Sequence, residues 1–373
     1  MADLVAIDLP GGPQFVRQLQ TAWDDGNAVA PVDQRLAPPA RGRLLDMLRP
    51  AWVVTPRGRL PRPAALALDD GDALVVATGG STGEAKAAVL THAAIGASAM
   101  ATSERLEVDP TRHRWLACLP LSHIGGLSVV TRSLLTGCPL SVLAGFDAAT
   151  VAAAGGPEVL VSLVPTALAR IDPALFYRVL LGGSEPPSSL APNVVTTYGM
   201  TETGSGVVYD GVPLRGVEIS ISATGEVALR CPMLMRAYRD GTVPFDAAGW
   251  FPTGDVGELD VQNRLQIRGR LSDMIITGGE NVWPSAVERI LRQHPGVGEV
   301  AVSSRPDPEW GERVVAVVVP ASTATPPSLE QLRALVRAEL AAYAAPKELV
   351  LLASLPKTSI GKLRRSALRE QLR

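Results

Sequence analysis

The sequence predicts an α/β fold in which a large N-terminal domain of α/β sheets, with a small β subdomain, precedes an α+β C-terminal domain. Short apolar runs alternate with helical segments between residues 72 and 198, and each run ends in polar, glycine or proline residues. From Gly216 the pattern changes to short strands separated by turns, and after Arg270 it changes again to mixed strands and helices. At 373 residues the chain is long enough for two or more domains.

The N-terminal part contains most of the expected strands. Residues 1 to about 65 are rich in proline and glycine, and we expect one helix there, over residues 13–23, at a reduced N-terminal edge. The run DALVVA at residues 72–77 predicts a buried strand, which leads through a glycine-rich loop to a helix over residues 92–105. A helix is also expected over residues 128–135, and further strands at residues 115–119, 141–143, 159–163, 179–181 and 194–198.

The C-terminal part divides into two units. Strands at residues 218–221 and 226–230 belong to a β subdomain over about residues 214–268. The second unit is expected to be compact, with helices over residues 285–293 and 329–342 and strands at residues 299–303 and 313–319. The expected domains are therefore residues 1–270 and 273–373.

Composition and charge exclude several classes of protein. The formal net charge is −2 and the basic residues form no dense run, which argues against nucleic acid as a partner. No apolar run approaches the roughly 20 residues that cross a bilayer. The N-terminus has no basic segment followed by an apolar one, so we expect a cytoplasmic protein without a membrane span. The three cysteines lack C-x-x-C spacing, which disfavours both a disulfide framework and a zinc site.

A glycine-rich loop after the strand at residues 72–77 is the first candidate phosphate-binding feature. Its hydroxyls, glycines and lysine are Thr78, Gly79, Gly80, Ser81, Thr82, Gly83 and Lys86. Backbone N–H groups and hydroxyls in such a loop can surround phosphate oxygens, and the lysine supplies charge. The spacing does not match G-x-x-x-x-G-K-[ST], so a P-loop NTPase is not expected. Taken alone, the loop is equally consistent with a surface turn.

Together with four further motifs, this loop resembles the adenylate-forming superfamily, which includes acyl-CoA synthetases. The motifs are YGMTET at residues 198–203, WFPTGD at 250–255, GRLSDMII with GGEN at 269–281, and PKTSIGK at 356–362. The resemblance extends from residue 72 to the end of the chain. It implies that a carboxylic acid is activated by ATP as an acyl-adenylate and then transferred to a thiol, with ATP, Mg²⁺ and coenzyme A as ligands.

The resemblance implies roles for residues around the phosphates and the nucleoside. Lys362 would bridge the carboxylate and the α-phosphate, Thr201 would contact phosphate, and Glu202 would hold Mg²⁺. Because an anion attacks an anion in this step, electrostatic stabilisation is expected to contribute most to catalysis. The implied nucleoside contacts are Gly182, Gly183, Ser184 and Tyr198 beside adenine, Asp255 on the ribose hydroxyls, and Arg270 on ribose or phosphate.

The same resemblance places an acyl site beside a thiol tunnel. His123, in LPLSHIGG at residues 119–126, matches a histidine between the two, and we expect it to be a gate or a substrate contact; a structural histidine is the alternative. Polar groups for the acid are expected from Ser128, Thr203, Ser205 and backbone amides near Gly199.

Residues after the β subdomain are implied in coenzyme A binding and in domain movement. Gly278, Gly279 and Glu280 would line the thiol tunnel, and Trp310 would pack beside the pantetheine chain, with a residue at the edge of the core as the alternative. Ser272 lies at the hinge position, about which a mobile C-terminal domain would withdraw Lys362 after adenylation.

Within the superfamily the sequence most resembles the actinobacterial 2-succinylbenzoate-CoA ligases of menaquinone biosynthesis, on its short length, SLVPT at residues 162–166, TGSG at 203–206 and Ser272. This implies formation of 2-succinylbenzoyl-CoA, AMP and diphosphate. An aryl- or short-chain acyl-CoA ligase would keep every motif, whereas a non-catalytic binding protein of this fold would have lost Lys362, Glu202 or Asp255. The expected partners are a carboxylic acid, ATP and coenzyme A, and a homodimer is one expected assembly.

Overall fold

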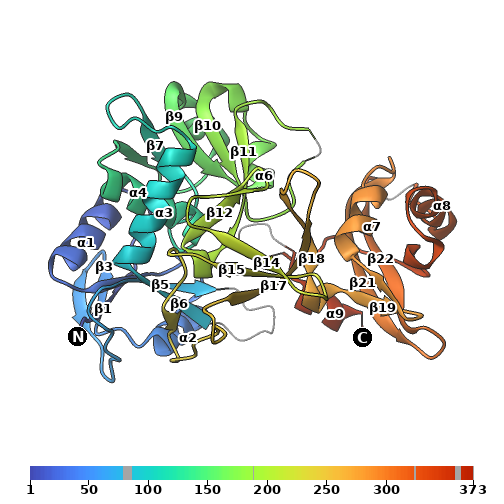
Figure 1. The fold of residues 1–373 in the computed structure, drawn as a ribbon, viewed down its shortest axis with the longest axis horizontal. Coiled ribbons are helices and arrows are strands. Elements are labelled where there is room, and N and C mark those ends of the chain that lie inside the picture. Colours follow the sequence, from blue (N-terminus) through green and yellow to red (C-terminus); the bar gives the residue numbers. More distant parts are fainter. Residues whose placement is uncertain (79–85, 188, 323–324, 358–362, 373) are drawn as a thin grey trace.

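The structure is a computed structural model that describes residues 1–78, 86–187, 189–322, 325–357 and 363–372. Two seven-stranded sheets and one four-stranded sheet make up the N-terminal part. A five-stranded sheet forms the C-terminal part, which lies at the opposite end of the molecule from the N-terminus (Figure 1). These sheets confirm the predicted α/β fold with an α+β C-terminal unit. Within the described ranges, no helix has the length and apolar character needed to cross a membrane.

The first seven-stranded sheet includes the N-terminal edge. Its order is β16 (Ala237–Tyr238), β6 (Lys86–Thr91), β5 (Asp72–Thr78), β2 (Ala28–Pro31), β1 (Leu4–Ile7), β3 (Trp52–Thr55) and β4 (Gly58–Pro61). The predicted helix is present as α1 (Pro13–Asp24), and the segment also contains four strands and α2 (Pro38–Leu48), which the sequence did not predict. Strands β1 and β2 are fully buried four-residue runs, too short to give a periodic signal.

The glycine-rich loop joins two antiparallel strands. The sequence predicted that the strand at residues 72–77 leads through this loop to a helix, but β6 intervenes and pairs with β5, so that Thr78 lies opposite Lys86. Helix α3 (His92–Arg105) begins only after β6, where the Thr91 hydroxyl accepts a hydrogen bond from Ala94 N. Thr78 and Lys86 are therefore neighbours at the ends of a hairpin, and residues 79–85 between them lie outside the described part of the chain.

The second seven-stranded sheet carries the YGMTET motif at the end of β11 and the segment with Gly182 and Gly183 after β10. Its order is β13 (Val212–Pro213), β12 (Ser205–Tyr209), β11 (Val194–Met200), β10 (Phe176–Leu181), β9 (Gly156–Leu163), β7 (Arg114–Ala117) and β8 (Leu140–Val142). Helices α3 and α4 (Ile124–Thr136) pack against each other, α3 against β5 and β12, and α4 against β7, β9 and β12. They therefore lie between the two large sheets, and their contact forms the main apolar core. Shorter helices of this region are α5 (Ala148–Ala153), α6 (Pro165–Leu168), η1 (Pro173–Leu175) and η2 (Thr201–Thr203).

The remaining strands form the predicted β subdomain and the C-terminal unit. The subdomain sheet is β14 (Glu218–Ile221), β15 (Glu226–Arg230), β17 (Phe251–Leu259) and β18 (Leu265–Arg270). The C-terminal sheet contains β19 (Ile275–Thr277), β20 (Glu280–Val282), β21 (Val297–Asp307), β22 (Gly311–Pro320) and β23 (Glu348–Leu351). Its helices are α7 (Pro284–Leu291), α8 (Leu329–Glu339), η4 (Ala342–Ala344) and α9 (Arg365–Gln371), and α7 and α8 cover an apolar core separate from the main one.

Arg239, which follows β16 in the first sheet, forms hydrogen bonds to two segments of the N-terminal region, at residues 48–49 and 66–67. It is buried, and its guanidinium donates to the carbonyl oxygens of Leu48 at 2.9 Å, Arg49 and Ala67 at 3.3 Å, and Leu66. Burial lowers the pKa of Arg239, so the carbonyl dipoles partly replace the water that this cation has lost.

We expect Arg239→Met to lower the free energy of unfolding by about 2 to 4 kcal/mol, because buried carbonyl groups lose their donors. Urea unfolding followed by circular dichroism measures this loss. Arg215→Met is the control, since Arg215 is largely exposed and forms a surface ion pair with Glu104. Equal stability of the two variants would contradict the assigned role.

Candidate active site

The YGMTET motif spans the end of β11 and the short helix η2. A Cβ atom on Gly199 would lie 2.2 Å from Ser205 O and 2.6 Å from the Gly206 Cα, so only glycine allows β11 and β12 to approach this closely. Thr203 is fully buried, and its hydroxyl accepts from Met200 N at 2.9 Å and donates to Ser205 O at 2.7 Å. These bonds hold the turn that presents Thr201 and Glu202, while a contact between Thr203 and the acid stays a prediction.

Tyr198 and Arg270 both contact the carboxylate of Asp255. Asp255 on β17 is 6% exposed, and it receives a hydrogen bond from the Tyr198 hydroxyl at 2.9 Å and an ion pair from Arg270 Nε at 2.8 Å. Burial and the charge of Asp255 raise the pKa of Tyr198, so the phenol stays a donor. The sequence predicted these three residues at a nucleoside site, and the structure brings them together.

Glu202, Tyr238 and Lys86 form a second polar cluster. The Tyr238 hydroxyl donates to Glu202 Oε1 at 3.0 Å, and Lys86 Nζ lies 4.8 Å from the centre of the Tyr238 ring. Burial and the nearby Glu202 charge raise the pKa of Tyr238. Sequence reasoning missed Tyr238, whose only signal was an aromatic residue in an otherwise polar segment. Lys86, Tyr238 and Arg236 also line a hollow of about 580 Å³.

This second cluster suits Mg²⁺ bound together with phosphate. Magnesium in nucleotide sites is usually held by one or two carboxylates plus substrate phosphates, and Glu202 offers one such carboxylate. No group of three or more metal-ligating side chains occurs among the described residues, so a site built from protein ligands alone has no candidate there.

The loop after β10 contains Gly182 and Gly183, so it exposes backbone with few side-chain atoms. A Cβ atom on Gly182 would lie 2.4 Å from Thr197 Oγ1 on β11, and Gly183 has a φ of +86°. Gly183 and Ser184 are exposed, as a planar base would require, and Tyr198 lies on the adjacent strand.

Arg132 is a buried cation beside two of the predicted acid-binding serines. Its side chain, on α4, is 1% exposed and donates to Ser205 Oγ at 3.0 Å, while Ser205 Oγ lies 3.5 Å from Ser128 Oγ. The guanidinium also stacks on Trp115, 4.6 Å from the ring centre, and burial lowers its pKa. Within the described chain, its Nε and Nη1 have no hydrogen-bond partner. Sequence reasoning missed Arg132, although an arginine inside the apolar run LSVVTRSLL was a signal.

His123 is the N-cap residue of α4, and its predicted place beside the acyl site stays a prediction. Its Nε2 is 2.9 Å from Arg35 Nη2, in the N-terminal segment that the sequence assigned no role. Gly126 keeps the loop compact, because a Cβ atom there would lie 2.6 Å from the carbonyl oxygens of Leu119 and Pro120.

The predicted coenzyme A residues gather at one face of the C-terminal unit. Gly278 N donates to Trp310 O at 2.8 Å, and a Cβ atom on Gly278 would lie 2.7 Å from the Trp310 ring. Lys347 Nζ lies 3.3 Å from the centre of the Trp310 ring, and Trp310 remains 38% exposed. Gly279 and Glu280 continue this exposed surface. A contact with coenzyme A stays a prediction.

The predicted hinge is held from both sides. Arg270, before it, donates to Thr253 O at 3.2 Å and pairs with Asp255 in the β subdomain. At the hinge residue itself, Arg369 on α9 donates to Ser272 O at 2.9 Å. Just after it, Arg365 Nε lies 3.3 Å from Asp273 Oδ2. Lys362, just before α9, and the loop residues Gly79, Gly80, Ser81, Thr82 and Gly83 lie outside the described residues.

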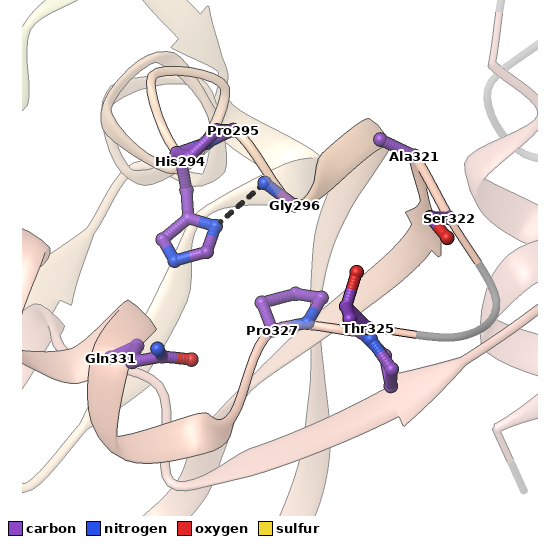
Figure 2. A pocket seen from close by; sticks show the side chains of 9 residues that line it. His294, Pro295, Gly296, Ala321, Ser322, Thr325, Pro327 and Gln331 are labelled. Atoms are coloured by element: carbon purple, nitrogen blue, oxygen red, sulfur yellow. Dashed lines mark hydrogen bonds between the residues drawn. The ribbon is translucent and has the colours of Figure 1, made fainter.

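Figure 2 shows a smaller hollow of about 340 Å³ in the C-terminal unit, separate from these clusters. His294 and Gln331 line it, and His294 Nδ1 accepts a hydrogen bond from Gly296 N at 3.0 Å. The sequence predicted no site residue there.

Comparisons with known proteins show the family of this chain. Residues 61–249 match the family model for AMP-binding enzymes, and residues 286–362 match the model for the C-terminal domain of these enzymes. The chain belongs to the AMP-binding enzyme family, which confirms the predicted resemblance.

Within this family the relatives of this chain include 2-succinylbenzoate-CoA ligases. It is 40% identical to a Mycobacterium tuberculosis protein named "Probable 2-succinylbenzoate--CoA ligase", over 88% of this chain and 93% of the relative. The structure of o-succinylbenzoate CoA synthetase from Bacillus subtilis with the acyl-adenylate intermediate matches with a TM-score of 0.86 and 26% identity, over 98% of this chain and 88% of the other. A structure of the same synthetase with ATP and magnesium ion matches with a TM-score of 0.85 and 26% identity, over 98% and 89%.

We expect Tyr238→Phe to weaken the response to Mg²⁺ by about three- to tenfold, because the Glu202 carboxylate loses a hydrogen bond that orients it. AMP release measured against Mg²⁺ concentration tests this expectation. Tyr177→Phe is the matched control, since Tyr177 contributes a ring that stacks on His113. An unchanged Mg²⁺ response in Tyr238→Phe would remove this residue from the site.

Proposed function

We propose that this protein is an ATP-dependent 2-succinylbenzoate-CoA ligase of menaquinone biosynthesis. It converts 2-succinylbenzoate, ATP and coenzyme A into 2-succinylbenzoyl-CoA, AMP and diphosphate through an acyl-adenylate. The family match, the ligase named above and the two polar clusters support this chemistry.

Arg132 is the observation that carries the choice of acid. 2-Succinylbenzoate has two carboxylates, and one of them keeps its charge when the other is activated. A buried charge without a counter-charge is unfavourable, so a site for a monoacid would gain nothing from Arg132. With its Nε and Nη1 unpaired, and with Ser205 and Ser128 nearby, Arg132 suits the carboxylate that does not react.

The residues of the two clusters have different roles in adenylation: one cluster binds the nucleoside, and the other binds Mg²⁺ and the phosphates. Adenine lies between the glycine surface at Gly182 and the Tyr198 side, and the Asp255 carboxylate, oriented by Arg270, accepts the ribose hydroxyls. Bound Mg²⁺ supplies charge neutralisation for the phosphates, and Glu202, oriented by Tyr238, is the residue that holds it. Lys86 adds positive charge on the same side.

The second step requires the C-terminal domain to turn about Ser272. Residues 1–270 and 273–373 are the proposed rigid units, and the turn withdraws Lys362 while the surface at Gly278 and Trp310 comes to the thiol. We place the enzyme in the cytoplasm, where ATP and coenzyme A are available. A homodimer stays a prediction that analytical ultracentrifugation tests.

A panel of carboxylic acids, followed by ATP- and coenzyme A-dependent release of AMP, tests the proposed substrate. We expect the highest kcat/KM with 2-succinylbenzoate. Robust turnover of an aryl or short-chain acid, with none of 2-succinylbenzoate, would replace the proposed substrate and keep the ligase chemistry.

We expect Arg132→Met to lower kcat/KM for 2-succinylbenzoate about 100-fold, because the second carboxylate loses its buried partner. The monoacid analogue that keeps the reacting carboxylate and lacks the other provides the comparison, and its kcat/KM should change little. The ligand-free variant should unfold at the same or a higher temperature, since a buried unpaired cation is removed. Equal losses for diacid and monoacid, together with a lower unfolding temperature, would mean that Arg132 is structural.

We expect Lys362→Ala to abolish ATP–diphosphate exchange and to retain thioester formation from supplied acyl-adenylate, because the lysine acts only in the first step. Lys357→Ala is the control, since Lys357 forms an exposed ion pair with Glu299. Equal loss of both half-reactions in Lys362→Ala would reject the proposed movement of the C-terminal domain.

A further inference from the structure

A bidentate ion pair in the N-terminal segment reaches His123. Arg35 donates through Nε to Asp33 Oδ1 at 2.8 Å and through Nη2 to Asp33 Oδ2 at 2.7 Å. The same Nη2 lies 2.9 Å from His123 Nε2, whereas the distance from this Nε2 to Asp33 Oδ2 is 3.6 Å. His123 Nε2 is therefore within hydrogen-bond distance of Arg35 Nη2 and not of Asp33 Oδ2.

The loop that carries this pair is itself fixed. Arg35 N donates to Asp33 Oδ1 at 3.0 Å, and Arg41 donates to Gln34 O at 3.2 Å and to Leu36 O at 3.4 Å. The Asp33 side chain is only 13% exposed. The bidentate pair with Arg35 supplies the counter-charge that this largely buried carboxylate needs. Asp33 therefore stays an anion and keeps the guanidinium in place.

This contact determines which nitrogen of His123 carries hydrogen. A guanidinium has only donors, so the nitrogen facing Arg35 has to be an acceptor without a proton. A neutral imidazole with an unprotonated Nε2 carries its hydrogen on Nδ1. Protonating Nε2 would place an imidazolium N–H against a guanidinium, with two like charges at hydrogen-bond distance.

We propose that Arg35, held by Asp33, is a positioning residue that fixes His123 as a neutral hydrogen-bond donor through Nδ1–H. This inference rests on the proposed function, in which His123 lies between the acyl site and the thiol tunnel. While the contact persists, His123 has no free acceptor nitrogen, so it does not take the proton of the thiol. Its contribution is to orient a substrate acceptor atom with Nδ1–H.

The tautomer of His123 provides a test that does not depend on substrate. Two-bond ¹H–¹⁵N spectra of the ligand-free enzyme distinguish the two nitrogens, and His123→Gln assigns the signal among the four histidines. We expect Nδ1–H in the unmodified enzyme and in Arg35→Lys, which can still donate to Nε2. Arg35→Met should shift the ring toward Nε2–H, the form that free histidine prefers. Arg41→Met is the matched control, because Arg41 holds the same loop and donates to Gln34 O, Leu36 O and Asp8.

Kinetics of the isolated second step complete the test. With supplied acyl-adenylate and coenzyme A, Arg35→Met should slow thioester formation about tenfold, as expected for one lost orienting hydrogen bond. Arg35→Lys should recover part of this rate, and Arg41→Met should stay within about twofold of the unmodified enzyme. An Nε2–H tautomer in the unmodified enzyme, or an unchanged tautomer and rate in Arg35→Met, would overturn the proposal. Equal losses in Arg35→Met and Arg41→Met would also overturn it, because they would assign the effect to the loop. Failure of 2-succinylbenzoate as a substrate would reject the proposed function and leave the tautomer result standing.

Discussion

The ion pair between Asp255 and Arg270 connects the predicted nucleoside site to the predicted boundary between the two domains. The two residues face each other across β17 and β18, and Arg270 is the last residue of β18. The carboxylate also receives the Tyr198 hydroxyl from β11, so three elements from two sheets converge on one buried anion. A ligand that contacts Asp255 would therefore contact the ion-pair partner of Arg270, which lies two residues before the predicted hinge at Ser272.

Among the described residues, the buried arginines Arg239 and Arg132 differ in their hydrogen-bond partners. The Arg239 guanidinium is surrounded by backbone carbonyls and serves the fold, whereas Arg132 keeps unpaired N–H groups beside two serines. Desolvation is unfavourable in both cases, but only Arg132 leaves donors to which a ligand could bind. Arg35 differs from both, because it is exposed, its carboxylate partner is present, and its Nη2 also contacts a histidine.

Local signals were enough to predict many elements of the fold. Helix α3 and strands β14 and β15 have the predicted bounds, since Gly225 marks the turn between the two strands and α3 follows a polar N-cap residue. Strand β6 was missed because a six-residue apolar run before a helix has no period that separates it from that helix. The motif residues Tyr198, Asp255 and Arg270 were found through the family resemblance. Tyr238, Arg132 and Arg35 were missed because their partners are 36, 73 and 88 residues away in sequence.

The contacts on either side of Ser272 limit where the chain can rotate. Arg270 is fixed to Asp255 and Thr253, while Ser272 O and the Asp273 carboxylate are fixed to α9. Between these contacts lies the backbone around Leu271 and Ser272, where the predicted hinge would turn. If the C-terminal domain turns there as proposed, small changes in two or three backbone angles would become large displacements at its far end, and α9, which is bonded to Ser272 and Asp273, would move with the domain.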